Sequence, residues 1–229
     1  RSEEGGQKII VKQNIIFDLG GVLLRWEPLE HVRRLLGPGA LAERVCRAVL
    51  EAPEWQDLDR GTLEEDEALI RFLKRLPGDE DAVRRVFAGL FEVLVPIEPH
   101  VALLPLLRAA GKRLFVLSNF SRRGYAYVSS RYDFFRFFDG GVVSYDVKLL
   151  KPEREIYETL LSRYALDPAT CLFFDDREEN VAASRAAGID AVVVRHAAPE
   201  HRGMAWPEAA SDTELPGTFD LKGEMERRG

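Results

Sequence analysis

Short, wholly apolar runs that alternate with stretches of helical spacing constrain the fold of this chain more than any other feature. An apolar run without polar alternation indicates a strand that is buried on both faces of a sheet. Helical segments between such runs indicate parallel strands that are joined by helical crossovers. The sequence therefore predicts an α/β fold in which helices cover both faces of a parallel sheet. The runs lie at 14–18, 113–117, 141–144, 171–174 and 191–194.

A second region interrupts this alternation after the first run. Residues 27–98 show no clear strand pattern, and their apolar residues recur at helical spacing, as at Leu29, Val32 and Leu36. Thr62, three residues ahead of Glu65, predicts a capping box where one of the helices begins. We therefore expect a small all-helical subdomain that is inserted into the α/β domain.

The predicted domain boundaries follow from this change of pattern. The α/β core domain is expected to span residues 14–26 and 99–200, and the helical subdomain residues 27–98. Residues 201–229 follow the last apolar run and contain several prolines, glycines and charged residues. We expect them to form a C-terminal tail.

Composition excludes several functional classes. The chain has 229 residues, of which 46% are hydrophobic, so it can bury a sizeable core. It contains no run of 18 apolar residues and no apolar segment near its first residue, so we expect neither a membrane span nor a secretory signal. A net charge of −6 gives no general attraction for nucleic acid.

The two cysteines, Cys46 and Cys171, match no metal-ligand spacing and make no disulfide framework. We therefore expect a cytoplasmic protein. Its oligomeric state is open between a monomer and a homodimer.

Polar side chains follow the apolar runs at the points where the predicted strands end. Ligands of open parallel sheets bind beyond the carboxyl ends of the strands, so these side chains are the candidates for a functional site. One hydroxyl, one amide, one ammonium and three carboxylates are expected at this edge. They are Ser118, Asn119, Lys151, Asp18, Asp175 and Asp176.

The three carboxylates would repel one another without a cation. A hard divalent ion such as Mg²⁺ resolves this conflict, because Mg²⁺ commonly binds one or two carboxylates, waters and a substrate phosphate. Lys151 adds a second positive charge. The set therefore suits a phosphoryl group, whose oxygens Lys151, Ser118 and Asn119 would hold while Asp18 attacks phosphorus.

These residues lie in four motifs that resemble those of the haloacid dehalogenase-like hydrolase superfamily, in the branch with a helical cap. The resemblance implies a Rossmann-like three-layer core and identifies residues 27–98 as the cap. The motifs appear in the family's order and frame most of residues 14–194. They are Ile15-Ile-Phe-Asp18-Leu-Gly-Gly-Val-Leu23, Val116-Leu-Ser118-Asn119, Leu150-Lys151-Pro152-Glu-Arg-Glu-Ile156-Tyr157 and Phe173-Phe-Asp175-Asp176-Arg-Glu-Glu-Asn180.

The resemblance also implies a role for each residue. Asp18 would be the nucleophile that forms an aspartyl-phosphate, which water then hydrolyses. Mg²⁺ would be bound by Asp18, the carbonyl of Gly20, Asp175 and, directly or through water, Asp176. Ser118 and Lys151 would hold the phosphoryl oxygens, and Asn119 would line the same pocket. Asn180 would support the loop near the acidic pair.

One position departs from the pattern of most phosphatases in this superfamily. They carry a second Asp two residues after the nucleophile, which protonates the leaving group and then activates water; here that residue is Gly20. General acid–base help is worth about 10²–10⁴-fold in rate. A replacement acid from the helical region is one solution, and four residues are candidates: His31, Asp57, Asp59 and Glu64.

A second departure is Lys148, where related sequences often have Gly. It either adds positive charge near the mouth of the site or is simply solvated, and we favour solvation.

Three functions compete at this stage. The first is a Mg²⁺-dependent phosphatase that acts on a small phosphorylated metabolite, such as a sugar phosphate. The second is a non-catalytic or weakly active phosphate-binding protein, which the glycine at position 20 would explain. The third is a haloacid dehalogenase, in which Asp18 would attack carbon without a metal; true dehalogenases usually carry an aromatic residue at the position of Gly20 and lack the acidic pair.

The leaving group of the substrate would contact the helical region. Trp55, Gln56, Asp57, Asp59 and Arg60 form a polar-aromatic segment there that would suit a small polar phosphate. The alternative is that Trp55 packs the seam between the helical region and the core.

Overall fold

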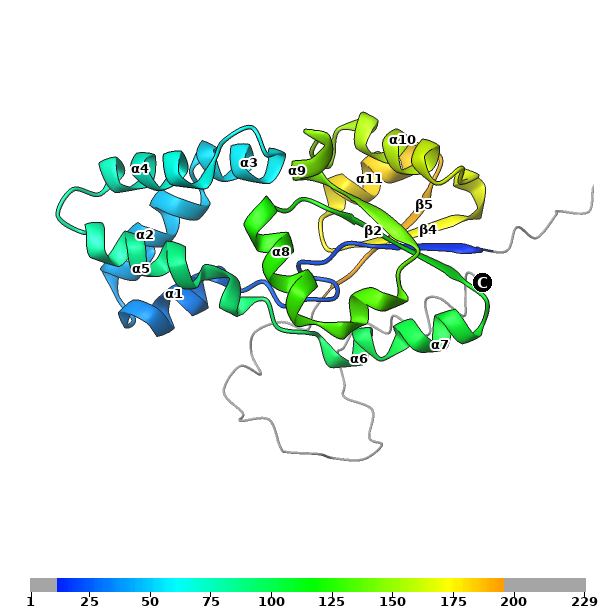
Figure 1. Cartoon of the computed structure of the whole chain (residues 1–229), viewed down its shortest axis with the longest axis horizontal. Helices are drawn as coiled ribbons and strands as arrows, with labels where there is room; N and C mark the ends of the chain where they lie inside the picture. The colour runs from blue at the N-terminus through cyan, green and yellow to red at the C-terminus, as the bar shows by residue number, and fades with distance from the viewer. Residues whose placement is uncertain (1–11, 196–229) are drawn as a thin grey trace, which may run out of the picture.

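The computed structural model describes residues 12–195 and divides them into two regions that lie side by side (Figure 1). One is an α/β layer structure and the other is a group of helices between residues 28 and 93. The expected tail, 201–229, and the last residues of the expected core domain, 196–200, lie outside the described residues. Within 12–195, no helix combines the length and the apolar character that a bilayer crossing requires.

The α/β region is built on one five-stranded parallel sheet. Its strand order is β3-β2-β1-β4-β5, so β1 lies at the centre. The chain adds β2 and β3 on one side of β1 and then returns to add β4 and β5 on the other side. This arrangement confirms the predicted α/β Rossmann-like class. The strands are β1 (Asn14–Phe17), β2 (Arg113–Ser118), β3 (Gly140–Val143), β4 (Cys171–Asp175) and β5 (Asp190–Val193).

Successive strand residues point into two separate apolar clusters, one on each face of the sheet. Ile15 and Phe17 of β1 belong to one cluster, whereas Ile16 between them belongs to the other. This period of two explains why the strands are apolar throughout, since both faces are covered. The covering helices are α6 (Glu98–Val101), α7 (Leu103–Ala109) and α8 (Arg122–Arg131) on one face, and α10 (Arg154–Arg163) and α11 (Glu178–Ala186) on the other (Figure 1).

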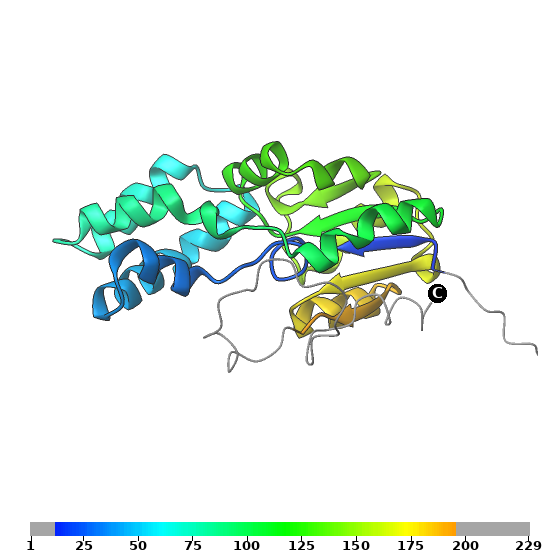
Figure 2. The ribbon, with the colours of Figure 1, turned by 90° about the horizontal axis from the view of Figure 1, so that it is seen from below.

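The helical region has an apolar cluster of its own. Val45, Val49, Phe72 and Val86 are completely buried in it, and each comes from one face of an amphipathic helix. The strand arrows of the sheet point toward this region (Figure 2), so their carboxyl ends face it. Its elements are α1 (Pro28–Leu36), α2 (Ala40–Leu50), α3 (Pro53–Arg60), α4 (Glu65–Arg75), α5 (Glu80–Gly89) and the 3₁₀ turn η1 (Leu90–Val93).

Several local expectations differ from the structure. Thr62 makes no capping box: α4 begins at Glu65 without a side-chain cap, and the Thr62 hydroxyl donates to the carbonyl of Asp57. Pro152 does not lie in the first turn of α10, where proline is favoured: this helix begins at Arg154, because a turn in which the Glu153 N–H donates to the Leu150 carbonyl precedes it. The sequence pattern also missed three short elements: η2 (Asp133–Phe137), α9 (Ser144–Val147) and η3 (Pro168–Thr170).

The connections between the two regions run next to each other. After β1, the carbonyl of Leu19 accepts the N–H groups of Leu23 and Leu24, which closes a tight turn directly behind Asp18. The returning chain then pairs with this turn, because the Ile97 N–H donates to the Leu23 carbonyl and the Arg25 N–H donates to the Val95 carbonyl. The helical region is therefore joined to the core within a few residues of Asp18.

Candidate active site

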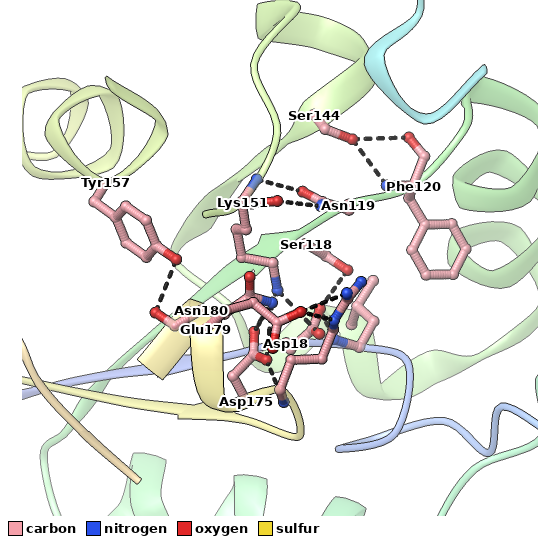
Figure 3. Close-up of polar contacts among 12 residues, drawn as sticks. Asp18, Ser118, Asn119, Phe120, Ser144, Lys151, Tyr157, Asp175, Glu179 and Asn180 are labelled. Atoms are coloured by element: carbon pink, nitrogen blue, oxygen red, sulfur yellow. Dashed lines mark hydrogen bonds and ion pairs between the residues drawn. The ribbon is translucent and has the colours of Figure 1, made fainter. Parts of the chain in front are cut away.

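The carboxyl ends of β1, β2 and β4 bring four buried polar side chains together. Asp18 follows β1, Ser118 ends β2, Asp175 ends β4, and Lys151 precedes α10. All four are buried, with relative exposures of 7%, 1%, 0% and 4% respectively. Figure 3 shows these side chains meeting at one point, although up to 157 residues separate them in the sequence.

Asp18 is held in one orientation by donors on both of its oxygens. Its Oδ1 accepts from the Leu19 N–H at 2.8 Å and from the Ser118 hydroxyl at 2.6 Å, and its Oδ2 lies 2.9 Å from Lys151 Nζ. Burial raises the pKa of Asp18 to about 7; Lys151 opposes this rise, while Asp175 and Asp176 add to it. The cluster is therefore short of positive charge, even with the lysine in place.

Lys151 bridges two carboxylates. Its ammonium lies 2.6 Å from Asp175 Oδ2 in addition to its contact with Asp18. Burial disfavours the charged ammonium, but Asp175 and Asp18 outweigh burial and raise the pKa of Lys151. Lys151 is therefore a permanent cation at the centre of the site.

Asn119 fixes the main chain of Lys151. Its Oδ1 accepts from the Lys151 N–H at 2.8 Å, and its Nδ2 donates to the Lys151 carbonyl at 2.9 Å (Figure 3). Both ends of the amide are thus engaged with the loop, although Asn119 also lines the cavity described below. The structure gives this residue a positioning contact that its place after a strand did not predict.

Asp175 is anchored from the opposite side. Its carboxylate accepts from the Arg177 N–H at 2.8 Å and from Asn180 Nδ2 at 3.0 Å. The buried Tyr157 hydroxyl donates to the Asn180 carbonyl at 2.9 Å. This chain of contacts links α10 and α11 to the end of β4. Asn180 was expected to support this loop, whereas Tyr157 had no signal beyond its place in the third motif.

Asp176 completes the acidic group, and one glycine makes room for it. One oxygen from each of Asp18, Asp175 and Asp176 lies within 4.8 Å of the others. Gly21 has φ +70°, and a Cβ on it would lie 2.3 Å from Asp176 Oδ2. Only glycine fits there, because any side chain would both strain the backbone and displace the carboxylate. The close approach was not evident from the sequence.

This donor set fits a hard divalent cation. Burial is the main cause of the raised pKa of Asp18, and the neighbouring carboxylates Asp175 and Asp176 add to it. Three carboxylates that converge within 4.8 Å therefore favour a cation in addition to Lys151. Oxygen ligands of this kind suit Mg²⁺. Asp18, Asp175 and Asp176 are the residues of 12–195 that offer such a group.

A cavity of about 680 Å³ opens from the cluster toward the helical region. Its core side includes Asp18, Gly20, Ser118, Lys151 and Asp176. Its other walls come from α1, α2, α3, η1 and the residues next to α1 and η1. They include Trp26, Leu29, Cys46, Leu50, Trp55, Asp59, Arg60, Phe91 and Leu94. The cavity is larger than a phosphate group requires, so it has room for an organic group attached to the phosphate.

Gly20 leaves an open space in this cavity. A Cβ on Gly20 would meet only Trp26 Cβ, at 3.8 Å, which is an ordinary contact. Of the four candidate acids from the helical region, Asp59 lines the cavity, whereas His31, Asp57 and Glu64 do not. His31 is bonded to the Gly89 carbonyl through Nε2 at 2.8 Å, inside the helical region.

The polar-aromatic segment is part of helix α3 and does two things. Trp55 stacks on Trp26 with ring centroids 6.1 Å apart. It therefore packs the seam between the helical region and the core, and it also lines the cavity. Arg60 donates to both carboxylate oxygens of Glu153, next to the Lys151 loop. Lys148 is also a seam residue, since its ammonium donates to the Gly61 carbonyl.

Comparisons with known proteins agree with this geometry. The sequence matches the haloacid dehalogenase-like hydrolase family over residues 12–188. It is 27% identical over 176 residues to the sesquiterpene phosphatase astK of Aspergillus oryzae, covering 76% of this chain and 85% of that protein. It is 28% identical over 184 residues to a phosphorylated carbohydrates phosphatase of Thermotoga maritima, covering 78% and 82%.

Solved structures share the fold. The HAD family enzyme bt-2542 of Bacteroides thetaiotaomicron superposes with a TM-score of 0.66 at 21% identity, over 81% of this chain and 94% of that chain. Its complex with magnesium and inorganic phosphate superposes with a TM-score of 0.61 at 20% identity, over 85% and 96%.

The chain therefore belongs to the haloacid dehalogenase-like hydrolase family, and the expected resemblance is confirmed. It is an enzyme of the hydrolase class, whose fold matches solved members of that family.

Proposed function

We propose that this protein is a Mg²⁺-dependent phosphatase that hydrolyses a small phosphate monoester through an aspartyl-phosphate on Asp18. One observation carries the proposal: the buried Asp18 carboxylate, held by Ser118 and Lys151, lines the core side of a cavity and lies beside two further carboxylates, Asp175 and Asp176. Two relatives that are named as phosphatases support the same class of reaction.

Asp18 is placed to attack. Its Oδ1 is oriented by the Leu19 N–H and Ser118, so the carboxylate cannot rotate freely, and orientation of a nucleophile lowers the entropic part of a barrier. Attack forms the bond from Asp18 oxygen to phosphorus and breaks the bond to the leaving oxygen. Water then attacks phosphorus, which releases phosphate and restores the Asp18 carboxylate.

Lys151 and Ser118 would contact the phosphoryl oxygens during both steps. Lys151 carries a positive charge at a buried position, where electrostatic stabilisation is stronger than in bulk water. Asn119 keeps this lysine in place through its main chain, so its contribution is positioning.

Asp18, Asp175, Asp176 and the Gly20 carbonyl would hold the Mg²⁺ ion. The ion would neutralise the negative charge that a phosphate brings into an already acidic site. The Asn180 amide and the Arg177 N–H orient Asp175 toward it. The acidic pair also argues against the dehalogenase alternative, because that reaction uses no metal and leaves these carboxylates without a function.

The cavity walls suit both an apolar organic group and a sugar on the phosphate. Buried apolar side chains line the cavity, among them Phe91, Leu94 and Leu150, and so do Arg47, Gln56 and Arg60, which offer hydrogen-bond partners to sugar hydroxyls. The two relatives act, by their names, on a sesquiterpene phosphate and on phosphorylated carbohydrates, which matches both possibilities.

A hydrolysis screen tests the function. Purified protein is offered p-nitrophenyl phosphate, terpenyl monophosphates and sugar phosphates, with Mg²⁺ or with EDTA. We expect Mg²⁺-dependent phosphate release, and the ratio of kcat/KM values for terpenyl and sugar phosphates then identifies the organic group. Absence of turnover of every ester, combined with binding of Mg²⁺ and phosphate, would instead establish the phosphate-binding alternative.

The proposal also includes a cytoplasmic location and a monomeric or homodimeric state. We infer a cytoplasmic enzyme from two buried free cysteines, Cys46 and Cys171, which suit a reducing compartment. Size-exclusion chromatography with light scattering distinguishes a monomer from a homodimer.

A further inference from the structure

We propose that Asp59 of helix α3 is the general acid and base of this enzyme, replacing the side chain that Gly20 lacks. The inference rests on the proposed phosphatase function and names a residue from the helical region as part of its chemistry.

The position of Asp59 is the first argument. It lines the same cavity as Asp18 and Gly20, but it enters from the helical region, on the side where an organic group would lie. The other carboxylates on the cavity wall outside the metal cluster are engaged or remote: Glu153 is paired with Arg60, Glu43 with Arg33, and Glu51 is exposed. Within residues 12–195, Asp59 makes no ion pair with lysine, arginine or histidine.

The rigidity of Asp59 is the second argument. Its carbonyl accepts from the buried Ser144 hydroxyl, which belongs to the core. The next residue, Arg60, is fastened to Glu153, and Gly61 ends the helix in the left-handed conformation against Tyr145. The last turn of α3 is therefore attached to the core, so Asp59 is held at a defined position over the site.

The environment of the Asp59 carboxyl group suits proton transfer. Burial raises its pKa to about 7; the hydrogen bond from the Ser121 N–H opposes this rise, and Asp18 adds to it. The other charged groups nearby are Arg60 with its partner Glu153, and Lys148 bonded to Gly61. An acid with a pKa near neutrality is effective both as a donor and, after transfer, as an acceptor.

The proposed proton path balances over the two steps. Asp59 gives its proton to the leaving oxygen as the bond from that oxygen to phosphorus breaks. The Asp59 carboxylate then takes a proton from the water whose oxygen attacks phosphorus, while the bonding electron pair returns to Asp18. The products are an alcohol and inorganic phosphate, and Asp59 ends protonated as it began.

The test compares two aryl phosphates of nearly the same shape. Phenyl phosphate has a basic leaving group that needs a proton, whereas p-nitrophenyl phosphate has a good leaving group that needs little help. For Asp59→Asn we expect kcat/KM to fall about 10²-fold or more with phenyl phosphate and less than about tenfold with p-nitrophenyl phosphate. The asparagine oxygen still accepts the Ser121 N–H, so the fold of the seam is kept, and Asp57→Asn on the same helix is the matched control.

Two further measurements separate proton transfer from a structural role. The wild-type kcat/KM for phenyl phosphate should decline above about pH 7, and Asp59→Asn should lose this alkaline limb, because a general acid must be protonated. Adding Gly20→Asp to Asp59→Asn should restore the phenyl phosphate rate, since position 20 has space for a side chain.

Equal losses with the two substrates, or equal rates of Asp59→Asn and wild type, would overturn the role of Asp59 while leaving the phosphatase function intact. A wild-type protein that turns over neither substrate with Mg²⁺ would overturn the function and this role together.

Discussion

The carboxyl edge of the sheet and the helical region bury different kinds of side chain. At the sheet edge, Asp18, Lys151 and Asp175 are nearly inaccessible, and each is held by at least two hydrogen bonds or ion pairs. The helical region instead buries an apolar cluster around Phe72 and Val86 and keeps most of its charges at the surface. Three carboxylates nevertheless converge near the Lys151 ammonium, so their negative charge is only partly compensated, and burying it costs stability until a cationic ligand binds.

The difference separates two tasks. The sheet edge is suited to the phosphoryl group, which is the same in every phosphate monoester. The helical region adds apolar and polar side chains to the cavity wall, and under the proposed function these would contact the part of the substrate that varies. Comparison of variants in the two regions should therefore separate loss of chemistry from loss of substrate fit.

The largest effect is expected at the nucleophile. Asp18→Asn removes the attacking charge, so kcat should fall by about 10⁴-fold or more for every substrate. Phosphate release measures this, and trapping of a phosphorylated protein by acid quench should succeed with wild type and fail with the variant. Asp66→Asn, on the exposed side of α4, is the control. Substantial activity in Asp18→Asn would place the chemistry elsewhere.

Removal of the metal should be nearly as damaging. EDTA is expected to reduce kcat by about 10²–10⁴-fold, because a metal ion contributes several kcal/mol of charge stabilisation, and added Mg²⁺ should restore the rate. Mg²⁺ should also raise the Tm of wild type, since a ligand at 100 times its Kd stabilises by about 2.7 kcal/mol. Asp175→Asn should lose most of this Tm shift; a shift that is equal in both proteins would contradict the metal site.

Two glycines with similar backbone conformations, Gly21 at the candidate site and Gly111 in a turn away from it, allow the effect of the site to be separated from that of the backbone. A Cβ added at Gly21 (φ +70°) would lie 2.3 Å from Asp176 Oδ2, whereas a Cβ added at Gly111 (φ +77°) would have no atom within 4 Å. Both Ala variants should lose about 1 kcal/mol of stability from the left-handed backbone. Only Gly21→Ala should also weaken Mg²⁺ binding, by about 10–100-fold. Mg²⁺ titrations of activity and denaturant melts measure both; equal Mg²⁺ affinities would show that the approach to Asp176 is unimportant.

The smallest effect is expected at the seam between the regions. Arg60→Ala and Glu153→Gln break an ion pair that is only partly buried, worth about 0.2–1 kcal/mol of stability. Because the pair fastens the last turn of α3, which carries Asp59, we expect KM to rise and kcat to fall, each by no more than a few-fold. A double-mutant cycle isolates the coupling. Arg154→Ala with Glu158→Gln, an exposed pair within α10, is the control, and a similar KM change there would remove the seam from the explanation.

Local sequence patterns were sufficient to predict the parallel sheet, the helical region and the polar residues at the ends of the strands. Runs such as Ile15-Ile-Phe reveal a doubly covered strand, because side-chain direction alternates along a strand wherever it lies. The expectation that Asp18, Ser118, Lys151 and Asp175 meet followed from parallel topology, since carboxyl ends share one edge. The capping box at Thr62 was wrong, because the Thr62 hydroxyl donates to the Asp57 carbonyl and α4 begins without a side-chain cap.

The remaining features depend on distances between segments that are far apart in the chain. The contact of Gly21 with Asp176, the two bonds from Asn119 to the Lys151 backbone, and the presence of Asp59 in the cavity arise only when separate elements pack. His31, Asp57, Asp59 and Glu64 were equivalent as isolated acids or bases in a helical pattern. Packing distinguishes them, because the docking of α3 on the core brings a single one of these four side chains, Asp59, to the wall of the cavity that Asp18 also lines.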